Sequence, residues 1–196
     1  MLEPRAITVF CGSSSGVDPR YAQTAVAFAE ALVARGLGLV YGGGNCGLMG
    51  RLADAVLGAG GTVHGVIPDF LVESEHAHTG LTEMLVVRSM HERKATMGDL
   101  GGAFVALPGG LGTFEELFEV LTWSQLGIHP KPIGIVEVGG YFDPLQALLD
   151  RAVTDGFVEA VDRGRLIADV DSGQLIDRLE ATPTRPSSIN RRSQGR

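Results

Sequence analysis

The sequence has few cysteines, few aromatic residues and no long apolar run. Cys11 and Cys46 are its only cysteines, too few for a disulfide framework, so we expect two buried free thiols. No histidine is suggested as a partner that would make Cys46 a nucleophile. No apolar stretch is long enough to cross a bilayer, and the first residues lead into a strand-like segment without a signal-peptide pattern. The sequence therefore favours a cytoplasmic protein that does not bind membranes.

Positive charge is also scarce. The net charge is −7, which argues against a nucleic-acid binder. Four arginines and no acidic residue lie in 182–196, so the rest of the chain carries −11. This basic tail lacks periodic apolar residues, and we predict that it is disordered. A phosphorylated ligand would need a local concentration of cations on such an acidic body, and Arg93-Lys94 provides one.

Strand-like and helix-like segments alternate through residues 1–181, which a chain of 196 residues can fold as one domain. Such alternation predicts an α/β fold, a single-domain Rossmann-like doubly wound parallel sheet with helices on both faces. The expected strands are 6–11, 37–41, 62–67, 84–87, 103–107, 132–137 and 166–170. The expected helices are 19–35, 48–57, 90–100, 113–126, 142–155 and 173–179.

The stretch from Leu107 to Glu116 has the clearest chemical signal. It follows an apolar strand and contains Gly109, Gly110 and Gly112 before a helix that we expect to begin near Thr113. Glycines allow positive φ and close approach of a ligand, and a helix N-terminus offers free N–H groups, so a phosphate cradle is one interpretation. The other is a capping box, because Thr113-x-x-Glu116 has that spacing and then needs no ligand.

Two further turns are candidates with structural alternatives. The turn 12–16 contains Ser14 and follows the first strand, at the carboxyl end where open α/β sheets bind ligands. Equally, it could be a simple connection in which Asp18 caps the next helix. Gly42-x-Gly44-x-x-Gly47 matches a dinucleotide fingerprint, with Asp69 as the acidic residue beyond it. A nicotinamide-dependent oxidoreductase is disfavoured because this match follows the second strand and no second domain remains. The histidines lack metal-ligand spacing, so we predict no metal or cofactor.

Four separated motifs resemble one family. They are Pro-Gly-Gly-x-Gly-Thr-x-x-Glu at 108–116, Ser-Met-His-x-Arg-Lys at 89–94, the glycine loop 41–50, and Thr-Trp-Ser-Gln-Leu-Gly at 122–127. Together they resemble the LOG ("lonely guy") proteins, over roughly residues 6–180. These are cytokinin riboside 5′-monophosphate phosphoribohydrolases, and relatives were long labelled lysine decarboxylases. Nothing in the sequence supports a pyridoxal phosphate site.

The resemblance implies a binding site for a nucleoside 5′-monophosphate. It also implies a homodimer whose sites lie at the subunit boundary. It implies Glu116 and Arg93 as catalytic residues, and Glu75 as a ligand contact for which Glu83 is a rival. The remaining substrate-binding candidates are Ser14, Gly43, Gly44, Lys94, Gly109, Gly110, Gly112, Thr113, Glu115 and Thr122. A non-catalytic nucleotide or molybdenum-cofactor carrier of the same fold is the alternative, although a carrier needs no catalytic pair.

Overall fold

The computed structural model describes residues 5–183. The predicted disordered tail lies outside these residues except for its first two positions. Seven strands form one sheet: β1 (Ala6–Phe10), β2 (Gly38–Tyr41), β3 (Val63–Pro68), β4 (Glu83–Val87), β5 (Ala103–Ala106), β6 (Ile133–Val136) and β7 (Leu166–Asp169). All neighbouring strands are parallel, in the order β4-β3-β2-β1-β5-β6-β7. The predicted fold is confirmed.

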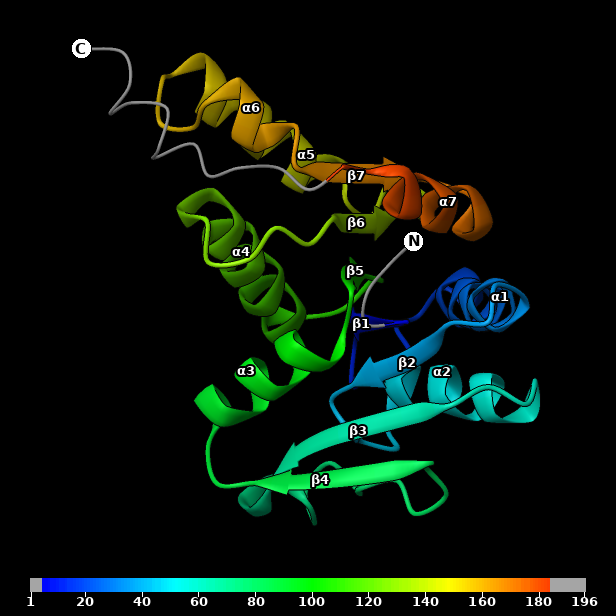
Figure 1. The fold of residues 1–196 in the computed structure, drawn as a ribbon. Helices are drawn as coiled ribbons and strands as arrows, with labels where there is room; N and C mark the ends of the chain where they lie inside the picture. The colour runs from blue at the N-terminus through cyan, green and yellow to red at the C-terminus, as the bar shows by residue number, and fades with distance from the viewer. Residues whose placement is uncertain (1–4, 184–196) are drawn as a thin grey trace.

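Helices cover both faces of this sheet (Figure 1). They are α1 (Pro19–Ala34), α2 (Gly47–Gly58), α3 (Met90–Leu100), α4 (Leu111–Leu126), α5 (Asp143–Thr154), α6 (Ala160–Arg163) and α7 (Ser172–Ala181), with a short 3-10 turn η1 (Asp69–Leu71). Helices α1, α2 and α7 pack on one face, and α3, α4 and α5 pack on the other. Among residues 5–183, no helix is long and apolar enough to span a membrane.

The strands are apolar on both sides because both sides are covered. In β1, Ile7 and Val9 point into the cluster with α1, α2 and α7, whereas Phe10 points into the cluster with α3 and α4. The chain runs outward from β1 through β2, β3 and β4, then returns to place β5 on the other side of β1. The strand order therefore reverses between β1 and β5, and a ligand crevice is expected beyond their carboxyl ends.

Local signals explain where the helices begin. The Asp18 side chain accepts a hydrogen bond from the Arg20 N–H at the start of α1, so the expected cap is present. Ser89 caps α3 by accepting from the Glu92 N–H, and Glu92 accepts in turn from the Arg88 N–H. Left-handed Gly127 ends α4. These caps are local in sequence, which explains why most predicted boundaries lie within two residues of the observed ones.

Three details differ from the sequence prediction. Helix α4 begins at Leu111 rather than near Thr113. Helix α6 was not predicted, because its four residues are too few to show a helical period. The segment 68–82, predicted as an irregular loop, contains the short turn η1. Only the first difference affects the site.

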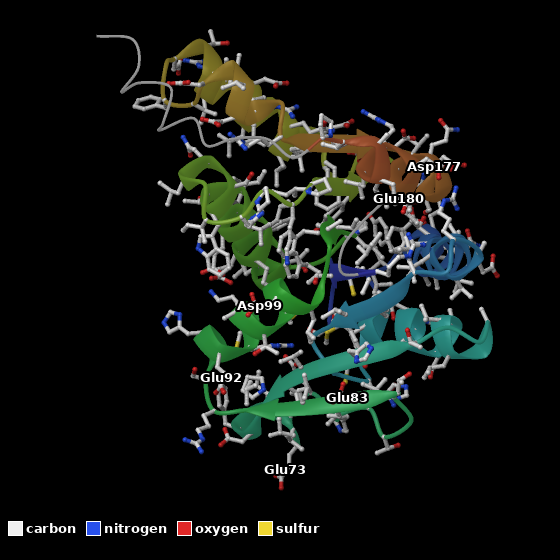
Figure 2. All side chains as sticks on the ribbon, in the orientation of Figure 1. Glu73, Glu83, Glu92, Asp99, Asp177 and Glu180 are labelled. Carbon is white, nitrogen blue, oxygen red and sulfur yellow. The ribbon has the colours of Figure 1, made fainter. Side chains whose placement is uncertain are left out.

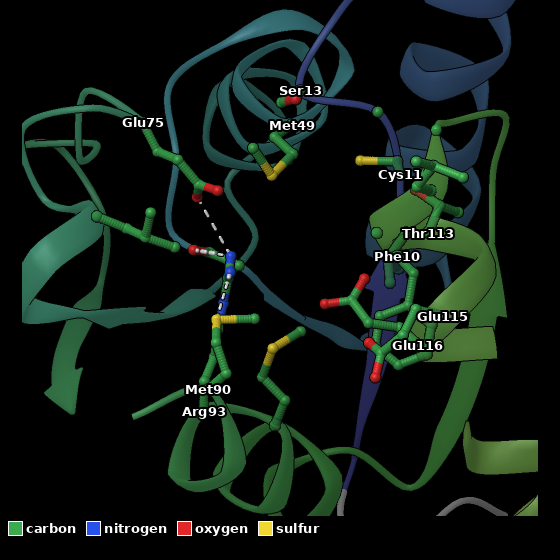
Figure 3. A pocket seen from close by; sticks show the side chains of 18 residues that line it. Phe10, Cys11, Ser13, Met49, Glu75, Met90, Arg93, Thr113, Glu115 and Glu116 are labelled. Carbon is green, nitrogen blue, oxygen red and sulfur yellow. Dashed lines mark hydrogen bonds and ion pairs between the residues drawn. The ribbon is translucent and has the colours of Figure 1, made fainter. Parts of the chain in front are cut away.

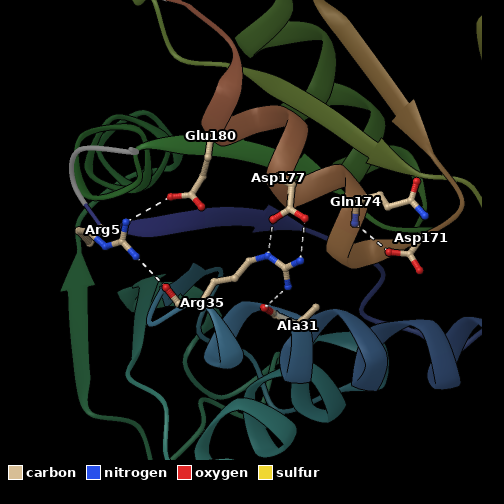
Figure 4. A network of polar contacts seen from close by, with 7 residues as sticks. All are labelled: Arg5, Ala31, Arg35, Asp171, Gln174, Asp177 and Glu180. Carbon is tan, nitrogen blue, oxygen red and sulfur yellow. Dashed lines mark hydrogen bonds and ion pairs between the residues drawn. The ribbon is translucent and has the colours of Figure 1, made fainter.

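Ion pairs join the first part of the described chain, at Arg5 and Arg35, to α7 (Figure 4). Arg35, just after α1, makes a two-point contact with Asp177 of α7 at 2.7 and 3.0 Å. Arg5 pairs with Glu180 of the same helix at 3.2 Å and donates to the Arg35 carbonyl. Other acidic side chains, including Glu73, Glu92 and Asp99, lie on the outer surface of the β4–α3 region (Figure 2). These contacts are remote from the crevice.

Candidate active site

A pocket of about 260 Å³ lies beyond the carboxyl ends of β1 and β5, at the reversal of strand order. Loops after β1, β2 and β5 and the starts of α3 and α4 form it (Figure 3). Its lining comprises Val9, Phe10, Cys11, Gly12, Ser13, Gly42, Met49, Leu71, Glu75, Met90, Arg93, Met97, Gly110, Leu111, Gly112, Thr113, Glu115 and Glu116. Both predicted catalytic residues are therefore in one pocket.

The turn after β1 is held between the two glycine turns. The Gly12 N–H donates to the Pro108 carbonyl at 3.0 Å, and the Leu48 N–H donates to the Gly12 carbonyl at 3.0 Å. Gly47, with φ of +58°, lies so close to Ser13 that a Cβ would be 2.4 Å from its carbonyl. Only glycine fits there, for both reasons. The three turns consequently form one unit at the carboxyl ends of β1, β2 and β5.

The start of α4 excludes the capping-box interpretation. The N-cap residue is Gly110, which has no side chain, and Glu116 lies in the second helical turn rather than at the third position. The first amide groups of the helix, from Gly110 to Thr113, line the pocket and have no side-chain cap. They provide N–H donors at the positive end of the helix dipole, as an anion site requires.

The glycines of this turn do not use the positive φ that glycine allows. None of Gly109, Gly110 and Gly112 has a positive φ. Gly109 is required by packing, because a Cβ would be 2.1 Å from the Thr113 hydroxyl oxygen and 2.7 Å from the Gly12 nitrogen. A Cβ on Gly110 or Gly112 would meet nothing within 4 Å. These two glycines therefore border open space rather than satisfy the protein's own packing.

Glu116 reaches the pocket from α4 and is partly buried. Burial raises the pKa of its carboxyl to about 7, against the lowering effect of the Arg93 charge, and the charges of Glu115 and Glu75 raise it further. A carboxyl with such a pKa can both accept and release a proton near neutral pH. The neighbouring Cys11 thiol stays protonated, because burial and the Glu116 charge raise its pKa.

Arg93 lies on the opposite side of the pocket from Glu116 (Figure 3). Its guanidinium donates to the Gly42 carbonyl at 2.8 Å, to the Val66 carbonyl at 3.1 Å and to Glu75 at 3.3 Å. The side chain is 6% exposed, so the cation is held rigidly at the pocket wall. A Cβ on Gly42 would be 2.1 Å from Nη2, which explains the glycine at the end of β2.

The loop after η1 carries Glu75 to Arg93. Backbone bonds from the Asn45 N–H to the Glu75 and His76 carbonyls fix this loop to the turn after β2. The Cys46 thiol, only partly buried, lies 3.6 Å from His76 Nδ1, a partner that the sequence pattern did not suggest. Cys46 does not line the pocket. Glu83, the rival of Glu75, pairs with His64 at the amino end of β4, far along the strand from the crevice.

Several other candidates lie outside this pocket. Lys94 bridges Glu115 at 2.6 Å and Glu119 at 2.9 Å, which joins α3 to α4. Thr122 donates to the Phe118 carbonyl on α4. Gly43 packs on Met84 and Ile67, and Gly44 makes a bridge with Ala77. These four residues hold the walls in place rather than line the pocket of their own chain.

Ser14 and Gly109 line a second pocket of about 190 Å³ behind the turn that starts α4. Its walls are Gly12, Ser13, Ser14, Ser15, Gly16, Tyr21, Leu48, Pro108, Gly109, Gly110 and Tyr141. Gly12, Ser13 and Gly110 line both pockets. These turns therefore form the partition between the two cavities.

Comparison with known proteins gives a consistent result. A family model described as "Possible lysine decarboxylase" matches residues 49–179. A cytokinin riboside 5′-monophosphate phosphoribohydrolase of Arabidopsis thaliana is 48% identical over 90% of this chain and 83% of its own. The enzyme of that name from Rhodococcoides fascians is 50% identical over 86% of this chain and 85% of its own. The chain belongs to the LOG family.

Solved structures with the same fold extend beyond the LOG family. A molybdenum cofactor binding protein from Rippkaea orientalis has a TM-score of 0.67 at 16% identity, covering 91% of this chain and 98% of its own. The molybdenum cofactor carrier protein of Chlamydomonas reinhardtii has a TM-score of 0.66 at 17% identity, covering 90% and 98%. At such identities the likeness shows the fold alone.

Sequence reasoning missed part of the lining. Gly42 and Ser13 line the pocket, whereas the neighbouring residues Gly43, Gly44 and Ser14 were proposed. Three methionines, Met49, Met90 and Met97, also contribute. Met49 lies on α2, and Met90 and Met97 lie on α3 on the opposite face of the sheet, so only the fold brings the three side chains to one pocket. Among residues 5–183, no group of three metal-ligating side chains lies together.

Proposed function

We propose that this LOG-family protein hydrolyses the N-glycosidic bond of adenosine 5′-monophosphate or its N6-substituted forms, releasing free base and ribose 5-phosphate. The observation that carries the proposal is one pocket holding a carboxyl with a pKa of about 7 beside uncapped helix amides and opposite a fixed arginine. The relatives' names indicate the substrate class, cytokinin riboside 5′-monophosphates.

Glu116 serves as the general base in this proposal. Breaking the bond between C1′ and the base nitrogen leaves positive charge on the sugar, which a nearby carboxylate stabilises. Glu116 takes a proton from a water molecule whose oxygen bonds to C1′. The electron pair of the broken bond stays with the base, which then receives a proton. A pKa near the working pH favours both the uptake and the return of that proton.

The amides of Gly110, Leu111, Gly112 and Thr113 bind the 5′-phosphate, as the positive end of α4 favours an anion. Binding energy at the phosphate, remote from the reacting bond, holds C1′ near Glu116. Arg93 contacts the nucleotide, and Glu75 holds Arg93 in position. Lys94 acts through Glu115, which it fixes at 2.6 Å.

We also propose a homodimer with its sites at the subunit boundary. Leu111 at the pocket rim is 86% exposed, and Phe118 and Leu126 on the same helix are also exposed. Their spacing of seven and eight residues places them with Thr122 on one face of α4. Covering that face with a second copy would enclose the pocket and give Thr122 access to the neighbouring site. Light scattering at micromolar concentration tests this, and a monomer mass contradicts it.

The test of activity is to incubate the purified protein with AMP and with an N6-alkylated AMP and to measure free base by chromatography. Adenosine is the matched control, since it has the same bond without the phosphate. We expect base release from both nucleotides and very little from adenosine. Tight nucleotide binding without base release would instead indicate a carrier of the same fold.

A further inference from the structure

We propose that Tyr141 is a positioning residue for phosphate recognition, because it orients the Gly109–Gly110 peptide that begins the α4 anion site. This inference rests on the function proposed above. Tyr141 lies on the loop between β6 and α5, and neither the sequence motifs nor the comparisons assign it a role. Its hydroxyl donates a hydrogen bond to the Gly109 carbonyl.

The direction of this hydrogen bond has a geometric consequence. Tyr141 and Gly109 line the second pocket and not the first. The Gly109 carbonyl therefore points toward the second pocket. In a trans peptide the C=O and N–H bonds point in opposite directions, so the Gly110 N–H is turned toward the first pocket. That N–H is the first donor of the uncapped helix terminus.

The tyrosine adds a restraint where the peptide itself has no side chains. The Gly109–Gly110 peptide joins two residues without side chains and can rotate at low cost. The packing of Gly109 against Thr113 and Gly12 fixes the position of its Cα. Nothing lies within 4 Å of a Cβ on Gly110. The Phe114 N–H holds the Gly110 carbonyl at 3.1 Å, and the Tyr141 hydroxyl holds the Gly109 carbonyl of the peptide that precedes it. A prearranged donor binds an anion more tightly than one that must first be ordered.

Tyr141 itself is held rigidly. The next residue, Phe142, is fully buried, and its N–H donates to Glu137 at 3.0 Å. Gly139 and Gly140, with φ of +59° and +79°, make the tight turn that aims Tyr141 back toward β5. The ring of Tyr141 meets Tyr21 edge to face at 5.6 Å and stacks near Phe114 at 6.4 Å. The hydroxyl is therefore presented from a fixed ring.

The test compares Tyr141→Phe with Tyr21→Phe. Each variant loses one hydroxyl from the second pocket and keeps its ring, but only the first loses the bond to Gly109. Calorimetry with ribose 5-phosphate and with adenine measures the two parts of the ligand separately. We expect Tyr141→Phe to bind ribose 5-phosphate about tenfold more weakly, with unchanged adenine affinity, as loss of one oriented donor predicts. We expect Tyr21→Phe to resemble the wild-type protein.

Three outcomes overturn the inference: equal ribose 5-phosphate affinity in both variants, a parallel loss of adenine affinity in Tyr141→Phe, or no binding of ribose 5-phosphate by the wild-type protein. Melting temperatures within a few degrees of wild type confirm that the ring still packs. NMR adds a readout that stability does not affect, since the Gly110 amide should shift on phosphate binding only in the wild-type protein and Tyr21→Phe. Wild-type binding of ribose 5-phosphate without base release from AMP would reject the proposed function and leave this inference intact.

Discussion

The two glycine turns at the edge of the sheet use glycine for opposite reasons. In the turn after β2, Gly43 and Gly47 have positive φ, and a side chain on Gly42 or Gly47 would strike Arg93 or Ser13. In the turn after β5, Gly109 is also required by packing, but Gly110 and Gly112 lack a positive φ and face open space. The first turn thus meets requirements of the protein itself, whereas the second leaves room for a ligand.

This difference separates two kinds of residue that a motif does not distinguish. Both turns are glycine-rich stretches of sequence, and both are among the motifs that resemble the LOG family. Substitutions in the first turn should damage the fold and lose activity indirectly. Substitutions around the second should damage binding or chemistry in a protein that stays folded. Substitutions at Glu116, Gly47 and Gly112 test this division.

Glu116→Gln should cause the largest loss. It keeps the side-chain volume and removes the base, so base release from AMP should fall on the order of 10²–10⁴-fold while ribose 5-phosphate still binds. Above pH 7 the variant should be more stable than the wild-type protein. The wild-type fold must ionise a carboxyl whose pKa has been raised from 4.5 to about 7, which costs free energy, and the variant has no such carboxyl. Turnover and melting at pH 8 are the measurements. Near-normal hydrolysis would show that Glu116 is not the base.

Gly47→Ala should instead damage the fold. The fold holds position 47 at φ of +58°, which a Cβ disfavours, and the new Cβ would lie 2.4 Å from the Ser13 carbonyl, so we expect a loss of about 2–4 kcal/mol in the free energy of unfolding. Urea denaturation measures this loss. Activity should recover at low temperature where the variant is folded. A variant as stable as the wild type would mean that the turn can rearrange.

The sequence predicted the second turn better than the first, for a physical reason. The motif at 108–116 is contiguous, and its own residues Gly110, Gly112, Thr113 and Glu116 line the pocket. Gly43 and Gly44 were proposed as ligand contacts, yet the residue of that turn that lines the pocket is Gly42, whose carbonyl holds Arg93 from α3. Contacts between segments far apart in the chain, such as Tyr141 with Gly109, leave no mark in local patterns.

The strands and helices themselves were predictable because their signals are local. Alternating apolar segments, Asp18 and Ser89 at helix starts, and Gly127 at a helix end all act within a few residues. The capping-box interpretation also came from a local pattern, and it was wrong because a local pattern does not fix where the helix begins. Thr113-x-x-Glu116 has the right spacing, but the helix begins two residues earlier, at Leu111, and Gly110 is its N-cap.

Activity should rise with pH through about 7 if Glu116 is the base. The carboxylate is the active form and exists above its pKa of about 7. Below that pH, kcat/KM should fall about tenfold per pH unit. The free energy of unfolding should change in the opposite sense, greatest below pH 4.5 for this group and lower as pH rises through 7. A kcat/KM profile that is flat between pH 5 and 8 contradicts the assignment.

Gly112→Ala should give the smallest effect and the most direct test of the comparison. Gly112 lies in the first turn of α4, where alanine fits the backbone and meets no neighbour within 4 Å. Replacing a helical glycine should stabilise the fold by about 0.5–1 kcal/mol. The added methyl group would enter the space assigned to the phosphate, so ribose 5-phosphate should bind about tenfold more weakly.

Gly58→Ala is the matched control, since Gly58 ends α2, also has open space around it and lies away from the pocket. Both variants should gain stability and only Gly112→Ala should lose affinity. If Gly112→Ala binds ribose 5-phosphate as tightly as Gly58→Ala does, the open space at the start of α4 is not the phosphate site. Light scattering on both variants separates this outcome from a change in assembly, because Gly112 lies beside the exposed Leu111.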